Sequence, residues 1–179
     1  GDASWKDNAL YPVWLQSALG AGARIREIIE YFGSAKQLYE AGETEWRMSP
    51  VLVPRQAERL SSASLAQAKD ILCTCRLNRW SVICYGDEAY PKRLADIENP
   101  PAVIYVDGIL PDIDNSIVIG VVGTRKASDY AVKATEVLSR GISEMGAVVV
   151  SGGALGVDTA AHRAAILAGG KTVAVLGCG

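Results

Sequence analysis

The residues best suited to chemistry lie in two glycine-rich segments, and that chemistry is the binding of an anion such as phosphate. The first segment, residues 120–128, reads GVVGTRKAS and leads into a helical pattern. Ser128 or Asp129 can cap that helix, so that the free backbone N–H groups of its first turn face the segment. Arg125 and Lys126 add positive charge beside these N–H groups. The competing interpretation is a tight strand–helix turn with solvated basic residues.

The second segment, residues 151–158, reads SGGALGVD and opens another helical pattern. Its three glycines, Gly152, Gly153 and Gly156, allow backbone N–H groups to approach a ligand closely. Parallel sheets bind ligands at the carboxyl ends of their strands. If the two segments follow adjacent parallel strands, they form one shared cleft.

Two common nucleotide motifs do not fit these segments. Residues 120–123 read GVVG, whereas a nicotinamide dinucleotide fold usually needs GxGxxG after its first strand. The strand that runs into Ser151 ends without the acidic residue that would hold the ribose. Residues 169–172, GGKT, lack the first glycine of a P-loop and precede a strand rather than a helix. Both motifs are disfavoured, and no cofactor is predicted.

Ser151, Asp158 and His162 are residue types that serve in nucleophilic catalysis. However, Asp158 and His162 are four residues apart on one helix face, a spacing more typical of a contact that holds a loop at the start of a helix. We therefore predict that Asp158 and His162 structure the loop, and we predict no catalytic residue.

Four cysteines and one histidine give no recognisable metal site. Cys73 and Cys75 are two residues apart, so on a helix they point away from each other. With no CxxC pair and no second histidine, a structural zinc site lacks ligands. Thiols of this kind, which include Cys84 and Cys178, are typical of a reduced cytosolic protein.

The elements that would position these residues follow from the period of the apolar side chains. Up to about residue 79 the period is helical, with helices over 24–32 and 35–41 and a glycine hinge at 19–23. Ser64 and Gln67 form a capping-box pattern that opens a further helix. The strands predicted after this helix cover residues 81–85, 102–106, 117–122, 147–150 and 172–176.

The last three strands alternate with helices over residues 131–145 and 159–167. Strand–helix–strand–helix–strand is the signature of an α/β fold with a parallel, doubly wound sheet. The first of these helices places five apolar side chains on one face: Ala134, Val137, Leu138, Ile142 and Met145. The sequence stops where the loop after the last strand should begin, so we expect a truncated sheet from a longer protein.

The composition excludes several classes of protein. Hydrophobic residues make up 49% and charged residues 21%, which predicts a packed core rather than disorder. No apolar run reaches the roughly 18 residues that span a bilayer, and the N-terminus lacks a signal-peptide pattern. Residues 115–179 hold 6 Lys or Arg against 4 Asp or Glu, a balance of +2 within a chain of net charge −2. This local excess is compatible with an anionic ligand.

Three runs of the sequence resemble the DNA-processing protein A family (DprA/Smf). They are VVGTRKAS at residues 121–128, VVVSGGALGVDTAAHRAAILAGGKTVAVLG at 148–177, and YGDEAYPKRLADIENPPAVIYVDG at 85–108. The first 60 or so residues are similar to the helical, sterile-alpha-motif-like domain that many members carry. The resemblance covers nearly the whole chain.

This resemblance implies a helical domain, sterile-alpha-motif-like or helix-hairpin-helix-like, over residues 1–63, and a Rossmann-like domain over 64–179. It further implies sequence-independent binding of single-stranded DNA, protection of incoming DNA in natural transformation, and loading of a RecA-type recombinase. Catalysis, metals and cofactors are not implied. The resemblance does imply a cytoplasmic location and a homodimer that forms through the part of the protein beyond residue 179.

The family motifs match this sequence at most, but not all, positions. The matching residues are Gly123, Thr124, Arg125, Ser128, Ser151, Gly152, Ala154, Gly156, Asp158, Ala161 and His162. Gly153, Leu155 and Ala131 depart from the usual Leu, Arg and Gly. Without an arginine at position 155, Arg125 is expected to carry more of the phosphate binding. The residues predicted to contact nucleic-acid phosphate are Gly123, Thr124, Arg125, Lys126, Ser128, Ser151, Gly152, Gly153, Gly156 and Lys171.

The alternative is a nucleotide-binding enzyme of the phosphoribohydrolase type, often labelled lysine decarboxylase, which uses a related sheet and a GGxGTxxE motif. Here Gly152 and Gly153 are followed by one residue too many before the next glycine, and no glutamate follows through Leu167. The missing carboxylate removes the expected catalytic residue. A nucleotide-sensing module without catalysis is a third interpretation, which binding of a nucleoside monophosphate without any effect of DNA would support.

Overall fold

The computed structural model describes residues 4–177, and the chain divides into two compact units, Gly1–Ile109 and Leu110–Gly179. The elements of the first unit are α1 (Ser4–Leu19), α2 (Ile25–Phe32), α3 (Ala35–Met48), α4 (Pro54–Ser62), α5 (Leu65–Leu77), β1 (Ser81–Cys84), α6 (Lys92–Ala95) and β2 (Val103–Val106). Those of the second are β3 (Val118–Gly120), α7 (Asp129–Glu144), β4 (Val148–Ser151), α8 (Val157–Leu167) and β5 (Thr172–Ala174). This division follows the contacts between residues within each unit. The domain boundary between residues 63 and 64 stays a prediction.

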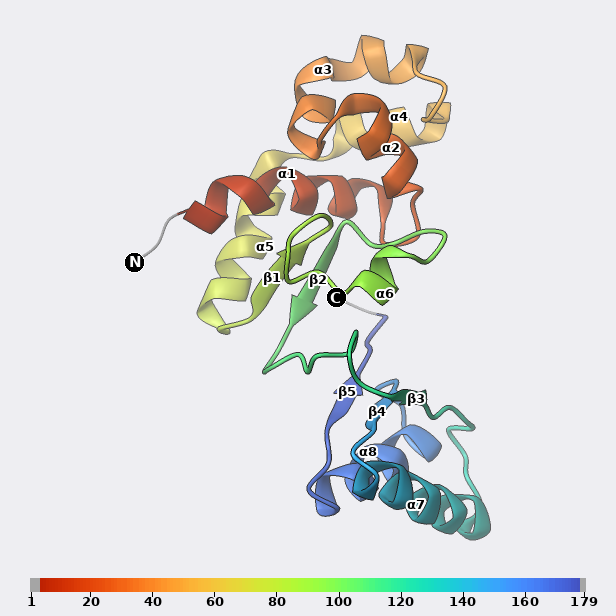
Figure 1. Ribbon diagram of the computed structural model, residues 1–179. Coiled ribbons are helices and arrows are strands. Elements are labelled where there is room, and N and C mark those ends of the chain that lie inside the picture. Colours follow the sequence, from red (N-terminus) through yellow and green to blue (C-terminus); the bar gives the residue numbers. More distant parts are fainter. Residues whose placement is uncertain (1–3, 178–179) are drawn as a thin grey trace. The chain divides into compact units, whose positions relative to one another are not determined.

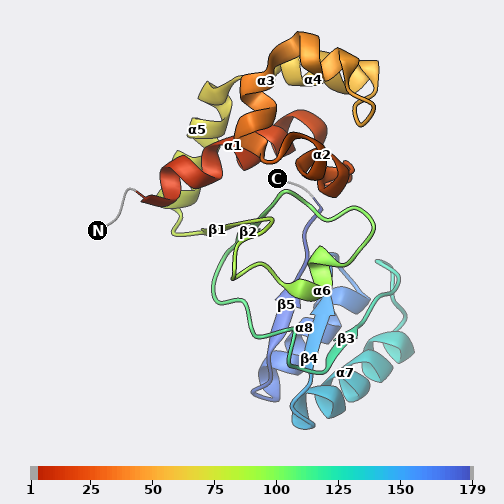
Figure 2. The same cartoon turned by 45° about the horizontal axis from the view of Figure 1, so that its top comes forward.

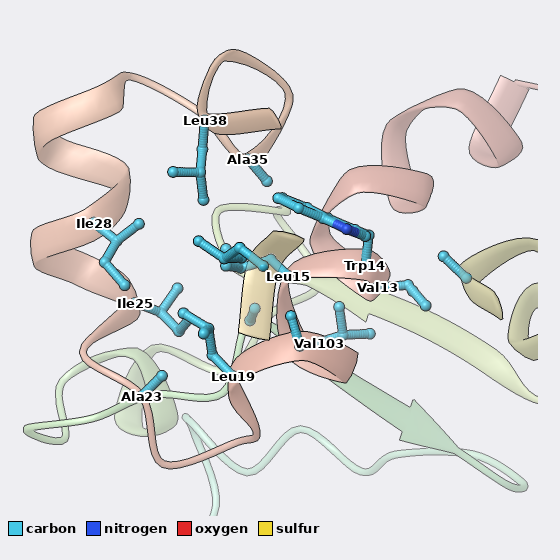
Figure 3. Packing of buried hydrophobic residues seen from close by; sticks show 14 of the residues in the cluster. Val13, Trp14, Leu15, Leu19, Ala23, Ile25, Ile28, Ala35, Leu38 and Val103 are labelled. Carbon is cyan, nitrogen blue, oxygen red and sulfur yellow. The ribbon is translucent and has the colours of Figure 1, made fainter. Parts of the chain in front are cut away.

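In the first unit, α3, α4 and α5 pack against α1, and α2 packs against α3 (Figure 1). Trp14 and Leu15 of α1 are fully buried, and Figure 3 shows them among side chains from α2, α3 and β2. The Trp14 indole N–H donates to the Ala63 carbonyl at 3.1 Å, so its polar edge is satisfied within the core. Ile25 and Ile28 of α2 are also fully buried, as their helical spacing predicts.

Gln16 joins α1 to the antiparallel pair of strands β1 and β2. Its amide nitrogen donates to the Val103 carbonyl at 2.7 Å, and its amide oxygen accepts from the Val103 N–H at 2.8 Å. The side chain thus supplies both hydrogen bonds that a neighbouring strand would give to this residue of β2.

The second unit is a parallel three-stranded sheet in the order β3–β4–β5 with two helices (Figures 1 and 2). Val149 of β4 is fully buried, with Ala161 and Ala165 of α8 and Ile142 of α7 in the same cluster. Because a strand residue points to one face of its sheet, both helices cover the same face. The predicted α/β class with a Rossmann-like parallel sheet is confirmed.

α7 buries a face other than its apolar one. The buried residues are Thr135, Ser139 and Ser143, whereas Val137, Leu138 and Met145 are 65%, 66% and 75% exposed. A surface helix ordinarily turns its apolar stripe to the core. Here α7 packs most extensively against α8, whose buried face is largely alanine. The small hydroxyl residues of α7 let the two helices approach closely. Ile142 packs half-buried against the cluster, and Val137, Leu138 and Met145 stay outside.

Candidate functional site

The two glycine-rich loops meet at the carboxyl edge of the parallel sheet. β3 ends at Gly120 and β4 at Ser151, and the parallel register puts both ends at one edge. The Val157 N–H, at the start of α8, donates to the Thr124 carbonyl at 3.2 Å. A direct hydrogen bond therefore joins the two loops at the edge where the sequence predicts a shared cleft.

Two glycines make this contact between the loops sterically feasible. A Cβ on Gly123 would lie 2.6 Å from Cγ2 of Val157, well inside van der Waals contact. Gly156 has a φ of +82°, and a Cβ there would collide with the Thr124 carbonyl oxygen. Each position excludes a side chain because the other loop occupies the space.

Arg125 and Lys126 are the exposed cations of the first loop. Within the part of the chain that the structure describes, neither side chain has an ion-pair or hydrogen-bond partner. The Thr124 hydroxyl accepts the Lys126 N–H at 3.1 Å, which leaves its own hydrogen free to donate. This loop thus offers two unpaired positive charges and a hydroxyl donor to an anion.

Both helices of the second unit begin at this edge. Ser128 caps α7, its hydroxyl oxygen accepting the Ala131 N–H at 3.3 Å, as the sequence predicts. α7 has 16 residues and α8 has 11, long enough for each N-terminus to present its unpaired N–H groups and positive dipole end. The two helix dipoles therefore add to the positive charges of Arg125 and Lys126 at this edge, where the first turns also carry the acidic Asp129 and Asp158.

Ser151 is committed to the sheet rather than to a ligand. Its hydroxyl donates to the Val121 carbonyl at 2.6 Å, and the residue is 3% exposed. A serine hydroxyl has one hydrogen, so this bond leaves none to give to a phosphate. Gly152 and Gly153 lie at the same edge, packed against the Asp158 carboxylate and the Leu176 side chain respectively.

The first turn of α8 holds the second loop in place. Asp158, only 8% exposed, accepts the Ala154 N–H at 3.4 Å, and the Thr159 hydroxyl donates to the Ala154 carbonyl at 2.8 Å. Both interactions return from the helix to the loop that precedes it. They pre-form the loop without any contribution from a ligand.

His162 bridges two strands and does not approach Ser151 as a catalytic base would. Its Nε2 lies 2.8 Å from the Gly152 carbonyl oxygen, which can only accept, so Nε2 carries a proton. Its Nδ1 lies 2.6 Å from the Thr172 hydroxyl of β5. Thr172 in turn donates to the Val149 carbonyl at 2.9 Å. A nucleophilic triad requires a base hydrogen-bonded to its nucleophile, and this arrangement lacks that contact.

Lys171 lies at the opposite edge of the sheet from the glycine loops. It precedes β5, and its carbonyl accepts the Val149 N–H at 3.0 Å. Strand residues rise about 3.3 Å each, so the three residues of β5 separate it from the carboxyl edge by about 10 Å. Hydrogen bonds from Asn115 chiefly lower the pKa of Asp112, and the charge of Lys171 adds a smaller effect.

The described residues lack the features of a metal site and of a membrane-spanning helix. No group of three His, Cys, Asp or Glu side chains within residues 4–177 is arranged to hold a metal ion. No helix in that range is long and apolar enough to cross a bilayer. Cys73 is an exposed free thiol, Cys75 and Cys84 are buried free thiols, and Cys178 lies outside the described residues.

The sequence profile of the family described as DNA recombination-mediator protein A matches residues 81–179. The chain is 42% identical over 93 residues to DNA processing protein DprA of Streptococcus pneumoniae, covering 52% of the chain and 32% of that protein. It is 31% identical over 139 residues to DNA processing protein DprA of Bacillus subtilis, covering 73% of the chain and 47% of that protein. The chain thus spans from about a third to about half the length of these relatives.

The structure is also similar to the X-ray structure of DNA processing protein A (DprA) from Streptococcus pneumoniae. The TM-score is 0.68 at 29% sequence identity, and the match covers 93% of this chain and 56% of that one. Because it covers so much of the chain, this similarity extends over both compact units.

Proposed function

This chain belongs to the DNA recombination-mediator protein A family (DprA/Smf), and we propose that its second unit binds single-stranded DNA without sequence preference. The observation that supports the proposal most is the loop of residues 123–128. Its unpaired Arg125 and Lys126 lie beside the N-terminus of α7, and hydrogen bonding joins it to the loop that opens α8. Cations and backbone N–H groups recognise phosphate, which every nucleotide carries.

The proposed contacts are a subset of those predicted from the sequence. Thr124, Arg125, Lys126 and Ser128 would contact phosphate through charge and hydroxyl groups. Gly123, Gly152, Gly153 and Gly156 would contribute only through their backbone, because neighbouring protein atoms fill the space that a Cβ would take. We assign Ser151, Asp158 and His162 to holding the loops, because their polar atoms are already used there. Lys171 would contribute only through long-range attraction.

In the cell, this activity would protect incoming strands during natural transformation and present them to a RecA-type recombinase. The names of the relatives, DNA processing protein and recombination mediator, support this role. We propose a binding protein rather than a hydrolase, because the glutamate of the GGxGTxxE motif has no counterpart through Leu167 and the one histidine is engaged with Gly152 and Thr172.

The proposal is tested by fluorescence anisotropy of a labelled oligo-dT strand, titrated with the full-length protein at several salt concentrations. Arg125→Ala is expected to weaken binding and to reduce the slope of log K against log salt by about 0.7, the value for one phosphate contact on a single strand. Arg140→Ala removes another exposed arginine, further along α7, and is expected to leave the slope unchanged. Duplex DNA should compete poorly.

Two results would contradict the proposal. The first is no salt-sensitive binding of oligo-dT by the wild-type protein. The second is equal loss of binding in Arg125→Ala and Arg140→Ala, which would indicate a general charge effect rather than a site. Hydrolysis of a nucleoside monophosphate by the same preparation would support the phosphoribohydrolase alternative.

A further inference from the structure

Tyr130 is an exposed aromatic ring immediately beside the proposed phosphate loop. It is 83% exposed, and among the described residues it has no ring or hydrogen-bond partner for its side chain. Tyr31, at 54% exposed, instead packs edge-on against Phe32. Burial of its large apolar ring usually stabilises a tyrosine, and the ring of Tyr130 lacks that burial in this unit.

The position of Tyr130 is set by the start of α7. It is the second residue of the helix, two residues after the cap Ser128 and four after Lys126. It precedes the buried Ser139 by nine residues, which at 3.6 residues per turn places it on the opposite face of the helix. The ring therefore points away from α8, on the solvent side of the helix end that carries the free N–H groups.

We propose that Tyr130 stacks on a nucleobase of the strand whose phosphates bind at residues 123–128. This inference rests on the proposed function and deepens it. Phosphate contacts fix the path of a strand, and its unpaired bases expose flat apolar faces that an aromatic ring can cover. Every base has such a face, so the contact adds affinity without adding sequence preference. Within residues 115–177 Tyr130 is the one aromatic side chain available for this role.

The neighbouring charges favour a nucleic acid over a protein at this ring. Arg125 and Lys126 precede it, and Lys133 follows one turn later as another exposed cation. Asp129 is the acidic residue in the first turn of α7, where it also interacts with the helix dipole. A strand held by the cations would bring its bases within reach of the ring.

The test compares the full-length protein with Tyr130→Ala and Tyr130→Phe on two ligands of equal length: oligo-dT and an oligonucleotide of abasic units. Tyr130→Ala is expected to weaken oligo-dT binding about 5- to 150-fold, the range for losing one base–aromatic stack. Affinity for the abasic strand should stay the same, because the phosphates are unchanged. Tyr130→Phe keeps the ring and should stay within about twofold of the wild type. The salt slope should not change in either variant, since no phosphate contact is lost.

Val137→Ala, which removes another exposed side chain of α7, controls for general effects on the helix. Equal weakening on both ligands, or wild-type affinity of Tyr130→Ala for oligo-dT, would overturn the stacking contact while leaving the phosphate site intact. An altered oligomeric state of Tyr130→Ala with unchanged DNA affinity would instead mark the ring as a protein contact and overturn the proposal. Absence of oligo-dT binding by the wild-type protein would refute the proposed function itself.

Discussion

At residue 156 the backbone adopts a φ of +82° with the carbonyls of Thr124 and Arg125 directly against its Cα hydrogens. Gly156→Ala introduces both a left-handed conformation and a collision with backbone atoms, which cannot rotate away. We expect a loss of about 1–3 kcal/mol in the free energy of unfolding. Because the collision pushes the two loops apart, affinity for oligo-dT should fall as well. Urea denaturation and the anisotropy titration measure the two effects.

Gly141→Ala is the matched control. Gly141 lies within α7, and a Cβ there would meet nothing within 4 Å. Because alanine is the better helix former, this variant is expected to gain about 0.5–1 kcal/mol and to keep wild-type DNA affinity. Equal stability of the two alanine variants would contradict the steric interpretation of Gly156.

At this scale the sequence indicated which residues cluster but not what each side chain does. Glycine spacing and position after a strand predicted the two loops, and Ser128 was among the predicted caps. The partners of Ser151 and His162 could not be predicted, because both bonds depend on strand register: one crosses to Val121 and the other to Thr172. In the sequence, Thr172 belongs to the segment GGKT, and nothing in that segment indicates its contact with His162.

At the scale of the element, we expect substitutions at two adjacent residues of α7 to differ in their effect on the free energy of unfolding. Leu138 is 66% exposed and Ser139 is fully buried, although their types suggest the reverse. Leu138→Ser is expected to change the free energy of unfolding by less than about 0.5 kcal/mol, as for other surface sites. Ser139→Leu should destabilise by about 1–3 kcal/mol, because two extra heavy atoms in the side chain do not fit between closely packed helices.

Thermal or urea unfolding of the full-length protein distinguishes these cases. Ser139→Ala serves as the control for Ser139: its buried hydroxyl has no hydrogen-bond partner among the described residues, so its removal should be neutral or stabilising. A large loss of stability in Leu138→Ser would show that the outer face of α7 is covered in solution, contrary to the structure of this unit.

Element boundaries were predictable where local signals were strong. The helices that begin at Ile25 and Leu65 lie where the sequence predicts them, and Ser64 caps the latter as its pattern indicates. Gly42 interrupts α3 with a φ of +79°, near the end of the predicted 35–41 helix. The continuation to Met48 and the whole of α4 were missed, since Pro54 reads equally as a connection or as the first residue of a helix. Apolar periodicity also cannot show which face of α7 is covered, because that depends on α8.

At the scale of the whole molecule, buried groups of the first unit make stability depend on alkaline pH. Burial, with a smaller effect from the charge of Asp87, raises the pKa of the Cys84 thiol to about 12. Burial also raises the pKa of Tyr90 to about 12, and its hydroxyl donates to the Pro101 carbonyl at 2.8 Å. In the unfolded chain these groups ionise near their ordinary values of 9 and 10. The unfolded state therefore releases protons that the folded state retains, and stability is expected to fall as pH rises from about 9 towards 12.

Urea denaturation at pH 7.5, 9 and 10.5 measures this dependence. Tyr90→Phe removes one ionisable group, so its stability should fall less steeply with pH, even though its stability at pH 7.5 is lower by the lost hydrogen bond. Tyr31→Phe, at an exposed tyrosine, should follow the wild type. A stability that is constant between pH 9 and 10.5 would contradict the burial of Cys84 and Tyr90.

The seam at which α7 packs against α8 determines the distance between the two loops that would contact a DNA strand. The buried side chains of α7 are no larger than threonine and the buried face of α8 is largely alanine, which allows the helix axes to approach the lower end of the usual range, about 8 Å. Both helices begin at the carboxyl edge, so this seam sets the gap between their two groups of first-turn N–H donors. Under the proposed function, this seam would set the spacing of the phosphate groups that the two loops bind along the sugar-phosphate backbone. Residues hidden between the helices, and never touching DNA, would then decide which pair of phosphates along one strand the protein holds.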